Sequence, residues 1–261
     1  MSSNLDRLAQ LSPERRRLLQ KLLEQEAEKT GGTDRIRRRG GDGPVPLSFA
    51  QQRLWFIDQL DPGTPAYNMP FPLRLRGRLE VAVLRRALSE VVRRHEALRT
   101  VFAADGDAAV QVVLPPAPVA FPLVDLARLR PEAREAETRR LAGEEAMRSF
   151  DLRRGPLLRS TLLRLDAHDH AALFTMHHVV SDGWSMGVLT RELSTLYHAF
   201  VRGEPSPLPE LPVQYADYAL WQRERLSGEA LEAQLGWWRE RLEGAPPTLD
   251  LPADRPPRAP P

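Results

Sequence analysis

Two adjacent histidines, His177 and His178, end an apolar segment and are the residues of this chain best suited to chemistry. Residues 174–185 read Phe-Thr-Met-His-His-Val-Val-Ser-Asp-Gly-Trp-Ser, which predicts a strand, a short turn and the start of a helix. Successive strand residues face opposite sides, so only one histidine can line a given cavity. We expect His178 to line it and His177 to pack in the core. We expect Gly183 to let the backbone turn tightly.

The chemistry that this segment suggests is proton transfer. An imidazole has an unperturbed pKa of about 6.5, so His178 can accept or orient the proton of an attacking amine near neutral pH. The helix that follows places amide groups and a positive dipole end beside the turn. Amides near Gly183 are therefore candidates to stabilise a developing oxyanion.

Other interpretations of the same residues are open. On patterning alone, a histidine pair at the end of a strand is more often core or surface than catalytic, and Asp182 could simply cap the next helix. His178 and Asp182 are four residues apart, so on a helix they could both bind one metal ion. Gly183 argues against a helix there, and no third ligand is evident. Ser181 and Ser185 lack the glycine-flanked nucleophile elbow. No phosphate-binding glycine loop occurs.

The elements expected around this segment are mixed helices and strands, which predicts an α/β or α+β layered fold. Ser48 is expected to cap a helix that ends at Asp61-Pro62-Gly63. Two apolar segments separated by a polar turn predict a β-hairpin, and apolar residues at helical spacing predict further helices. The expected strands cover 71–75, 99–102, 109–114, 157–165 and 171–177, and the expected helices cover 79–98, 131–149, 185–202, 213–226 and 229–243.

Composition excludes several classes of protein. The 261 residues contain no cysteine, so disulfides, thiolate metal sites and a cysteine nucleophile are excluded. The net charge is +2, from 37 basic and 35 acidic residues, which is too balanced for a nucleic-acid binder. No run approaches the ~18 apolar residues of a membrane span, and the first residues lack a secretory pattern. We expect a cytoplasmic protein without nucleic-acid or membrane partners.

Four regions divide the chain. Residues 1–30 are expected to form an amphipathic leader helix that starts at Ser12-Pro13-Glu14, and residues 31–46 a flexible linker rich in arginine and glycine. The globular part is expected over 47–244. Residues 245–261 are rich in proline and cannot hold a regular element for long.

Four motifs in the same order resemble those of condensation domains of nonribosomal peptide synthetases. The central one is His-His-x-x-x-Asp-Gly at 177–183. Related acyltransferases share it, but three further motifs accompany it here. These are Ser-Phe-Ala-Gln-Gln-Arg-Leu-Trp-Phe at 48–56, Arg-His-Glu-Ala-Leu-Arg-Thr-Val-Phe at 94–102 and Tyr-Ala-Asp-Tyr-Ala-Leu-Trp-Gln at 215–222. The likeness runs from about Leu47 to the last residue.

The resemblance implies a fold like that of chloramphenicol acetyltransferase, in which two related lobes enclose a channel. It also implies that the amine of one carrier-bound aminoacyl thioester attacks another carrier-bound thioester to form a peptide bond. No cofactor is bound directly, because both substrates arrive on phosphopantetheine arms of donor and acceptor carrier domains. An adjacent adenylation domain is a further implied partner. The turn at 181–185 and the segment 61–68 are similar to the subtype that joins two L-configured residues.

The resemblance also assigns roles to residues of the turn. His178 would deprotonate or position the amine, or stabilise the tetrahedral intermediate. Asp182 would be structural and would pair with an arginine, for which Arg99 is the first candidate and Arg94 the second. An unpaired buried carboxylate is costly, so loss of that arginine should destabilise the turn.

The later motifs of the family, which belong to the second lobe, do not occur in this sequence. We therefore expect an amino-terminal lobe with residues 245–261 leading toward the missing lobe, and no condensation by these residues alone, because both walls of the channel position the thioesters. Two alternatives are an acyltransferase of the same superfamily that uses coenzyme A, and a non-catalytic fragment whose leader docks a partner.

Overall fold

The computed structural model describes residues 35–41, 43–106 and 108–246. The expected leader helix, and all but the first two residues of the proline-rich end, lie outside the described residues. The chain divides into two compact units after Gln222, and each is described by itself. The second unit contains helix α8 (Gly228–Leu242), on which the rings of Trp237 and Trp238 meet edge to face.

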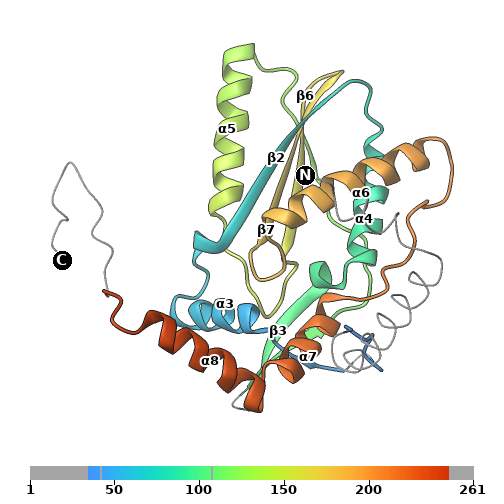
Figure 1. Cartoon of the computed structure of the whole chain (residues 1–261). Helices are drawn as coiled ribbons and strands as arrows, with labels where there is room; N and C mark the ends of the chain where they lie inside the picture. Colours follow the sequence, from blue (N-terminus) through green and yellow to red (C-terminus); the bar gives the residue numbers. More distant parts are fainter. Residues whose placement is uncertain (1–34, 42, 107, 247–261) are drawn as a thin grey trace, which may run out of the picture. The chain divides into compact units, whose positions relative to one another are not determined.

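The first unit is built from two sheets and the helices around them (Figure 1). Its strands are β1 (Val45–Pro46), β2 (Asn68–Arg76), β3 (Thr100–Asp105), β4 (Ala108–Val113), β5 (Leu123–Asp125), β6 (Leu158–Asp166) and β7 (Asp169–His177). Its helices are α3 (Phe49–Leu60), α4 (Val81–Arg94), α5 (Pro131–Met147) and α6 (Gly183–Val201), with the 3₁₀ turns η1 (Pro65–Tyr67) and η2 (Glu96–Arg99). Helix α7 (Tyr215–Arg225) belongs to this unit as far as Gln222.

The larger sheet has the strand order β2-β7-β6-β5, and only β5 runs parallel to its neighbour. The smaller sheet is antiparallel, with the order β1-β4-β3. The predicted hairpin of two apolar strands is confirmed as β6 and β7. Strand β2 lies at an edge of its sheet, which explains how it accommodates Pro70 and Pro72. The α/β layered fold class is confirmed.

Strand β7 is buried on both faces because helices cover the larger sheet on both sides. Phe174 and Met176 point toward α4 and α6, which pack against each other, and belong to the same core as Leu88. Leu173 points the other way and packs with Leu141 of α5. Figure 1 shows α5 on one side of β2, and α4 with α6 on the other. This layering fixes the direction of each residue at the end of β7, where the histidines lie.

Four residues of the predicted linker, Arg38, Arg39, Val45 and Pro46, are bonded to the body of the first unit and so do not form a flexible linker. The Arg39 amide donates to Oδ1 of Asp217 at 3.1 Å, and its guanidinium lies 2.7 Å from Glu96. Val45 pairs with Gln111 in the smaller sheet. Glu96 and Asp217 are carboxylates with little solvent contact. A buried carboxylate without a cation is costly, so the positive charge of Arg39 is needed beside them, and this fixes Arg39 in place.

The polar residue Ser48 starts α3 as predicted. Its hydroxyl accepts from the Gln51 amide at 3.2 Å, and the Gln51 side chain accepts from the Ser48 amide at 2.9 Å. This reciprocal pair satisfies two amides that a helix start leaves without partners.

Candidate active site

The turn between β7 and α6 is closed by a reciprocal cap. Strand β7 ends at His177, residues 178–180 turn, and α6 begins at Gly183. Asp182 accepts from the Ser185 amide at 2.9 Å and from its hydroxyl at 2.7 Å, while the Asp182 amide donates to the same hydroxyl at 3.1 Å. The interpretation of Asp182 as a helix cap is therefore confirmed. These bonds, with the Ser185 side-chain bond largest, hold the pKa of Asp182 below its ordinary value.

His178 is exposed at this turn, and its ring is oriented by the turn itself. Its Nδ1 lies 2.6 Å from the carbonyl oxygen of Ser181, and its amide donates to the Tyr67 carbonyl at 2.9 Å. A carbonyl oxygen only accepts, so Nδ1 carries the hydrogen and a neutral ring has its lone pair on Nε2. No described residue bonds to Nε2, so this nitrogen can accept a proton from an incoming group.

His177 packs in the interior as expected. It is 3% exposed, its Nδ1 accepts from the Val179 amide at 3.1 Å, and its ring meets the Phe150 ring edge to face at 5.9 Å. Burial, followed by the charge of neighbouring His178, lowers the pKa of His177 to about 4. The side chain is therefore neutral at pH 7 and has no access to an incoming substrate.

Gly183 does not make a tight turn that other residues would avoid. Its backbone is not in the left-handed region, and an added Cβ would meet nothing within 4 Å. The expectation that glycine is needed here for the turn is wrong. The Gly183 amide opens α6, and the first amides of a helix lack an intrahelical acceptor. No described residue accepts a hydrogen bond from it, so it is available to an oxyanion.

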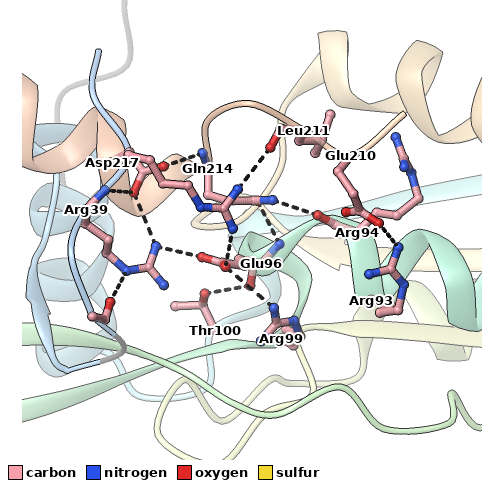
Figure 2. Close-up of polar contacts among 12 residues, drawn as sticks. Arg39, Arg93, Arg94, Glu96, Arg99, Thr100, Glu210, Leu211, Gln214 and Asp217 are labelled. Atoms are coloured by element: carbon pink, nitrogen blue, oxygen red, sulfur yellow. Dashed lines mark hydrogen bonds and ion pairs between the residues drawn. The ribbon is translucent and has the colours of Figure 1, made fainter. Parts of the chain in front are cut away.

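The expected ion pair between Asp182 and an arginine is wrong. Asp182 is exposed to solvent and already bonded to Ser185, so it does not need a cation. Arg99 instead lies against Glu96 at 3.6 Å (Figure 2). It also donates to the Leu114 carbonyl. Glu96 also binds Arg39, which Figure 2 shows between Glu96 and Asp217.

The second arginine candidate, Arg94, is buried against Glu192 of α6. Its Nε lies 3.1 Å from Glu192 Oε2, and its Nη1 donates to the carbonyls of Leu208 and Pro209. The same carboxylate oxygen lies 2.9 Å from Nε2 of His95. Burial raises the pKa of Glu192, but the bonds from Arg94 and His95 outweigh it and the net pKa is lowered. Glu192 is therefore ionised.

Glu192 and His95 were not predicted as a pair from the sequence. The signal was present, because an acid at position 192 interrupts the apolar stripe formed by Leu189, Leu193 and Leu196 on α6. An acid on a buried helix face requires a partner. The partners, however, come from the end of α4, about a hundred residues earlier in the chain.

Neither a metal site nor a membrane span is evident in the part of the chain that the structure describes. No three histidine or acidic side chains among the described residues are grouped so as to hold a metal ion. No described helix is long and apolar enough to cross a membrane.

The geometry thus defines a layered α/β lobe with one exposed histidine at a strand-to-helix turn. The sequence model of the family described as Condensation domain matches residues 42–261. The chain belongs to the condensation domain family.

Curated relatives of this family are large synthetases. A linear gramicidin synthase of Brevibacillus parabrevis is 53% identical over 213 residues, which are 82% of this chain and 4% of the relative. Phosphinothricin tripeptide synthetase PhsC of Streptomyces viridochromogenes is 48% identical over 250 residues, 96% of this chain and 23% of the relative.

Solved structures show the same fold. The X-domain from teicoplanin biosynthesis, solved in complex with OxyB, has a TM-score of 0.74 and 33% identity, covering 86% of this chain and 49% of that one. The first condensation domain of the CDA synthetase has a TM-score of 0.70 and 24% identity, covering 79% and 52%. The starter condensation domain of rhizomide synthetase RzmA has a TM-score of 0.70 and 22% identity, covering 78% and 49%. The chain thus spans about half the length of these structures, and a small part of the curated relatives.

Proposed function

We propose that a domain containing these residues forms peptide bonds between two carrier-bound thioesters, with His178 as the proton acceptor. The single observation that carries this proposal is the orientation of His178, whose Nδ1 is engaged by the Ser181 carbonyl at 2.6 Å while Nε2 remains open. Membership of the condensation family and high identity to peptide synthetases support the same reaction.

The proposed reaction is an addition followed by an elimination. The amine nitrogen of the acceptor attacks the thioester carbon of the donor, and the carbonyl electrons move to oxygen, where the Gly183 amide stabilises the oxyanion. Nε2 of His178 takes the proton that the amine loses. The intermediate then collapses, the carbon–sulfur bond breaks, and the departing sulfur takes the proton back from His178. The products are an amide and a free thiol.

The other residues of the site hold this geometry. Asp182 keeps the turn closed through Ser185, and His177 packs the turn against Phe150. Arg94 and Arg99 support the lobe through Glu192 and Glu96, not through Asp182. The substrates are held on phosphopantetheine arms of donor and acceptor carrier domains in the cytoplasm, with an adenylation domain nearby, and both amino acids are L-configured.

The test is a condensation assay with two loaded carrier domains, read by mass spectrometry of the carrier-bound product. The protein is this chain joined to the carboxyl-terminal half of a condensation domain from the same synthetase. We expect a dipeptidyl product that His178→Ala abolishes, and no product from the 261 residues alone. A parallel reaction with acyl coenzyme A as donor tests the alternative acyltransferase. Faster transfer from coenzyme A than from the carrier would refute the proposal.

A non-catalytic docking function is the second candidate, because the X-domain that this chain is similar to was solved in complex with OxyB. Arg38, Arg39, Val45 and Pro46 are bonded to the body of the first unit, so the leader can be tested by deleting residues 1–34 alone. If the shortened chain loses a synthetase partner in a pull-down but the completed domain keeps its condensation rate, the leader is a docking element and the lobe is still catalytic. If the completed domain binds its partner but forms no product, docking is its function.

A further inference from the structure

Arg39 lies upstream of the four sequence motifs and outside the residues that the family model matches, which begin at residue 42. Its side chain is nevertheless only 10% exposed. One nitrogen of its guanidinium, Nη1, lies 2.7 Å from Oε2 of Glu96 and 3.4 Å from Oδ1 of Asp217 (Figure 2). A single cationic group therefore bridges two carboxylates that come from two different motifs.

The two carboxylates depend on this cation to different degrees. The Glu96 side chain is 11% exposed and has two further arginines near it, Arg99 at 3.6 Å and Arg38 at 3.9 Å. The Asp217 side chain is 0% exposed, and among the described residues Arg39 is the cation within ion-pair distance of it. A buried carboxylate without a cation is costly, and two carboxylates beside one another repel. Without Arg39, the segments that carry Glu96 and Asp217 would therefore be driven apart.

The bridge closes a ring of contacts between η2 and the start of α7. Glu96 is the first residue of η2, and Asp217 is the third residue of α7. Oδ2 of Asp217 accepts from the Gln214 amide at 2.7 Å, as an acid at the third position of a helix commonly does. The Gln214 side chain in turn accepts from the Glu96 amide at 3.1 Å and donates to the Arg94 carbonyl at 2.8 Å. Each member of the ring is thus held from two sides.

The ring lies beside the turn that carries His178. Leu98 of η2 and Gln214 line one cavity together with Val180 and Trp184 of the turn. The positions of η2 and of the start of α7 therefore set the surroundings of the reacting groups. A displacement of about 1 Å near a reaction can lower its rate about a hundredfold. A residue that fixes both segments can consequently affect the rate without touching a substrate.

We propose that Arg39 is a positioning residue for the reaction at His178, because it bridges Glu96 and Asp217 and so keeps η2 and the start of α7 in place beside the turn. The proposal rests on the proposed function, since it concerns the rate of that reaction. It also moves the start of the functional lobe upstream of residue 42, to include Arg39.

Two deletions in the completed domain test where the functional lobe begins. Deleting residues 1–34 keeps Arg39, whereas deleting residues 1–41 removes it and leaves the whole range that the family model matches. We expect the shorter deletion to keep the wild-type kcat. The longer deletion should lower kcat by about tenfold to a hundredfold. The KM of each carrier domain should change less than kcat, because the ring fixes groups beside the reacting atoms. A wild-type kcat after the longer deletion would overturn the proposal.

Substitutions of Arg39 test the bridge itself. Both carboxylates are bound by one nitrogen atom, so the single ammonium group of a lysine can take its place. Arg39→Lys should therefore keep kcat within about threefold of the wild type, whereas Arg39→Met should lose as much as the longer deletion. The matched control is Arg38→Met, because the neighbouring Arg38 side chain is 57% exposed and lies 3.9 Å from Glu96. Equal kcat values for the two methionine variants would contradict the bridge.

A double variant separates positioning from stability. Arg39→Met alone leaves the buried Asp217 carboxylate without a cation, which can unfold the chain. Adding Asp217→Asn removes that charge, and the asparagine oxygen can still accept from the Gln214 amide. We expect the double variant to regain stability in urea unfolding but to keep a low kcat, because nothing then ties Asp217 to Glu96. If kcat recovers together with stability, Arg39 only stabilises the fold and the positioning role is refuted.

Hydrogen exchange in the 261-residue chain tests the ring without catalysis. The amides of Glu96 and Gln214 both donate within the ring, so both should exchange about tenfold or more faster in the double variant. The Val179 amide, which donates to His177, is the internal reference and should not change. Unchanged exchange at Glu96 and Gln214 would show that Arg39 does not hold the ring. A completed wild-type domain that forms no peptide bond would instead refute the proposed function, whatever the exchange rates are.

Discussion

Nδ1 of His178 lies 2.6 Å from the carbonyl oxygen of Ser181, so the turn that carries the histidine also sets its tautomer. Proton transfer then depends on Nε2. In the completed domain, we expect His178→Ala to lower kcat by about 10²–10⁴, the usual range for loss of a general base. An asparagine amide can still donate to the Ser181 carbonyl but cannot accept a proton from an amine, so His178→Asn should lose as much. Single-turnover rates at saturating carriers measure both. Substantial activity in the asparagine variant would instead indicate positioning.

Gly183 can be tested because its conformation does not require glycine. An added Cβ meets nothing within 4 Å, so Gly183→Ala should change the free energy of unfolding by less than about 1 kcal/mol. If the open space beside the amide is where the oxyanion forms, the methyl group should lower kcat. Gly187→Ala is the matched control, since Gly187 lies in the same helix with open space beside it. Equal rates for both alanine variants would remove Gly183 from the reaction.

Asp182 should behave as a helix cap and not as half of an ion pair. Asp182→Ala removes the acceptor for the Ser185 amide and should destabilise the chain by about 0.5–2 kcal/mol. Asparagine caps helices almost as well as aspartate, so Asp182→Asn should lose only the interaction of the charge with the helix dipole, about 0.3–1 kcal/mol. Urea unfolding at pH 7 measures both values. An ion pair would predict similar losses for the two variants.

Local features of the site could be predicted from the sequence, whereas its long-range partners could not. The hairpin, the Ser48 cap and the inward and outward directions of His177 and His178 follow from alternation and capping, which act between neighbouring residues. The partner of Arg94 lies 98 positions away on α6 and depends on how α4 packs against that helix.

The linker predicted around Arg39 was wrong for a related reason. The residues around Arg39 are rich in arginine and glycine, which is the composition of a linker. The residues that hold it, Glu96 and Asp217, lie in two distant motifs and become neighbours only in the folded unit. The composition of a segment predicts its flexibility only when the segment makes no contacts with the rest of the fold. Here Arg39 contacts Glu96 and Asp217.

Arg93 and Arg94 are adjacent arginines with opposite burial, which makes them a matched pair. The Arg94 side chain is 2% exposed and faces Glu192, whereas the Arg93 side chain is 40% exposed and faces Glu90. Arg94→Met leaves a buried carboxylate with only His95 as partner and should cost about 3–5 kcal/mol. Arg93→Met should cost less than about 1 kcal/mol. Urea unfolding compares them, and adding Glu192→Leu to Arg94→Met should restore part of the loss. Similar losses for the two single variants would contradict the assignment.

His177 makes the folded chain sensitive to mild acid. Its pKa is lowered from 6.5 to about 4, so between these values the unfolded chain binds a proton that the folded chain does not. Stability is therefore complete above about pH 6.5 and is lost as the pH falls toward 4, with about 2 kcal/mol lost from this group between pH 7 and pH 5. His177→Gln removes the titrating group, so the stability difference between wild type and variant should shrink by that amount over the same interval. Urea unfolding at both pH values measures this stability difference. The control is the variant His198→Gln, because His198 is exposed. If the difference is the same at pH 7 and pH 5, burial does not keep His177 neutral.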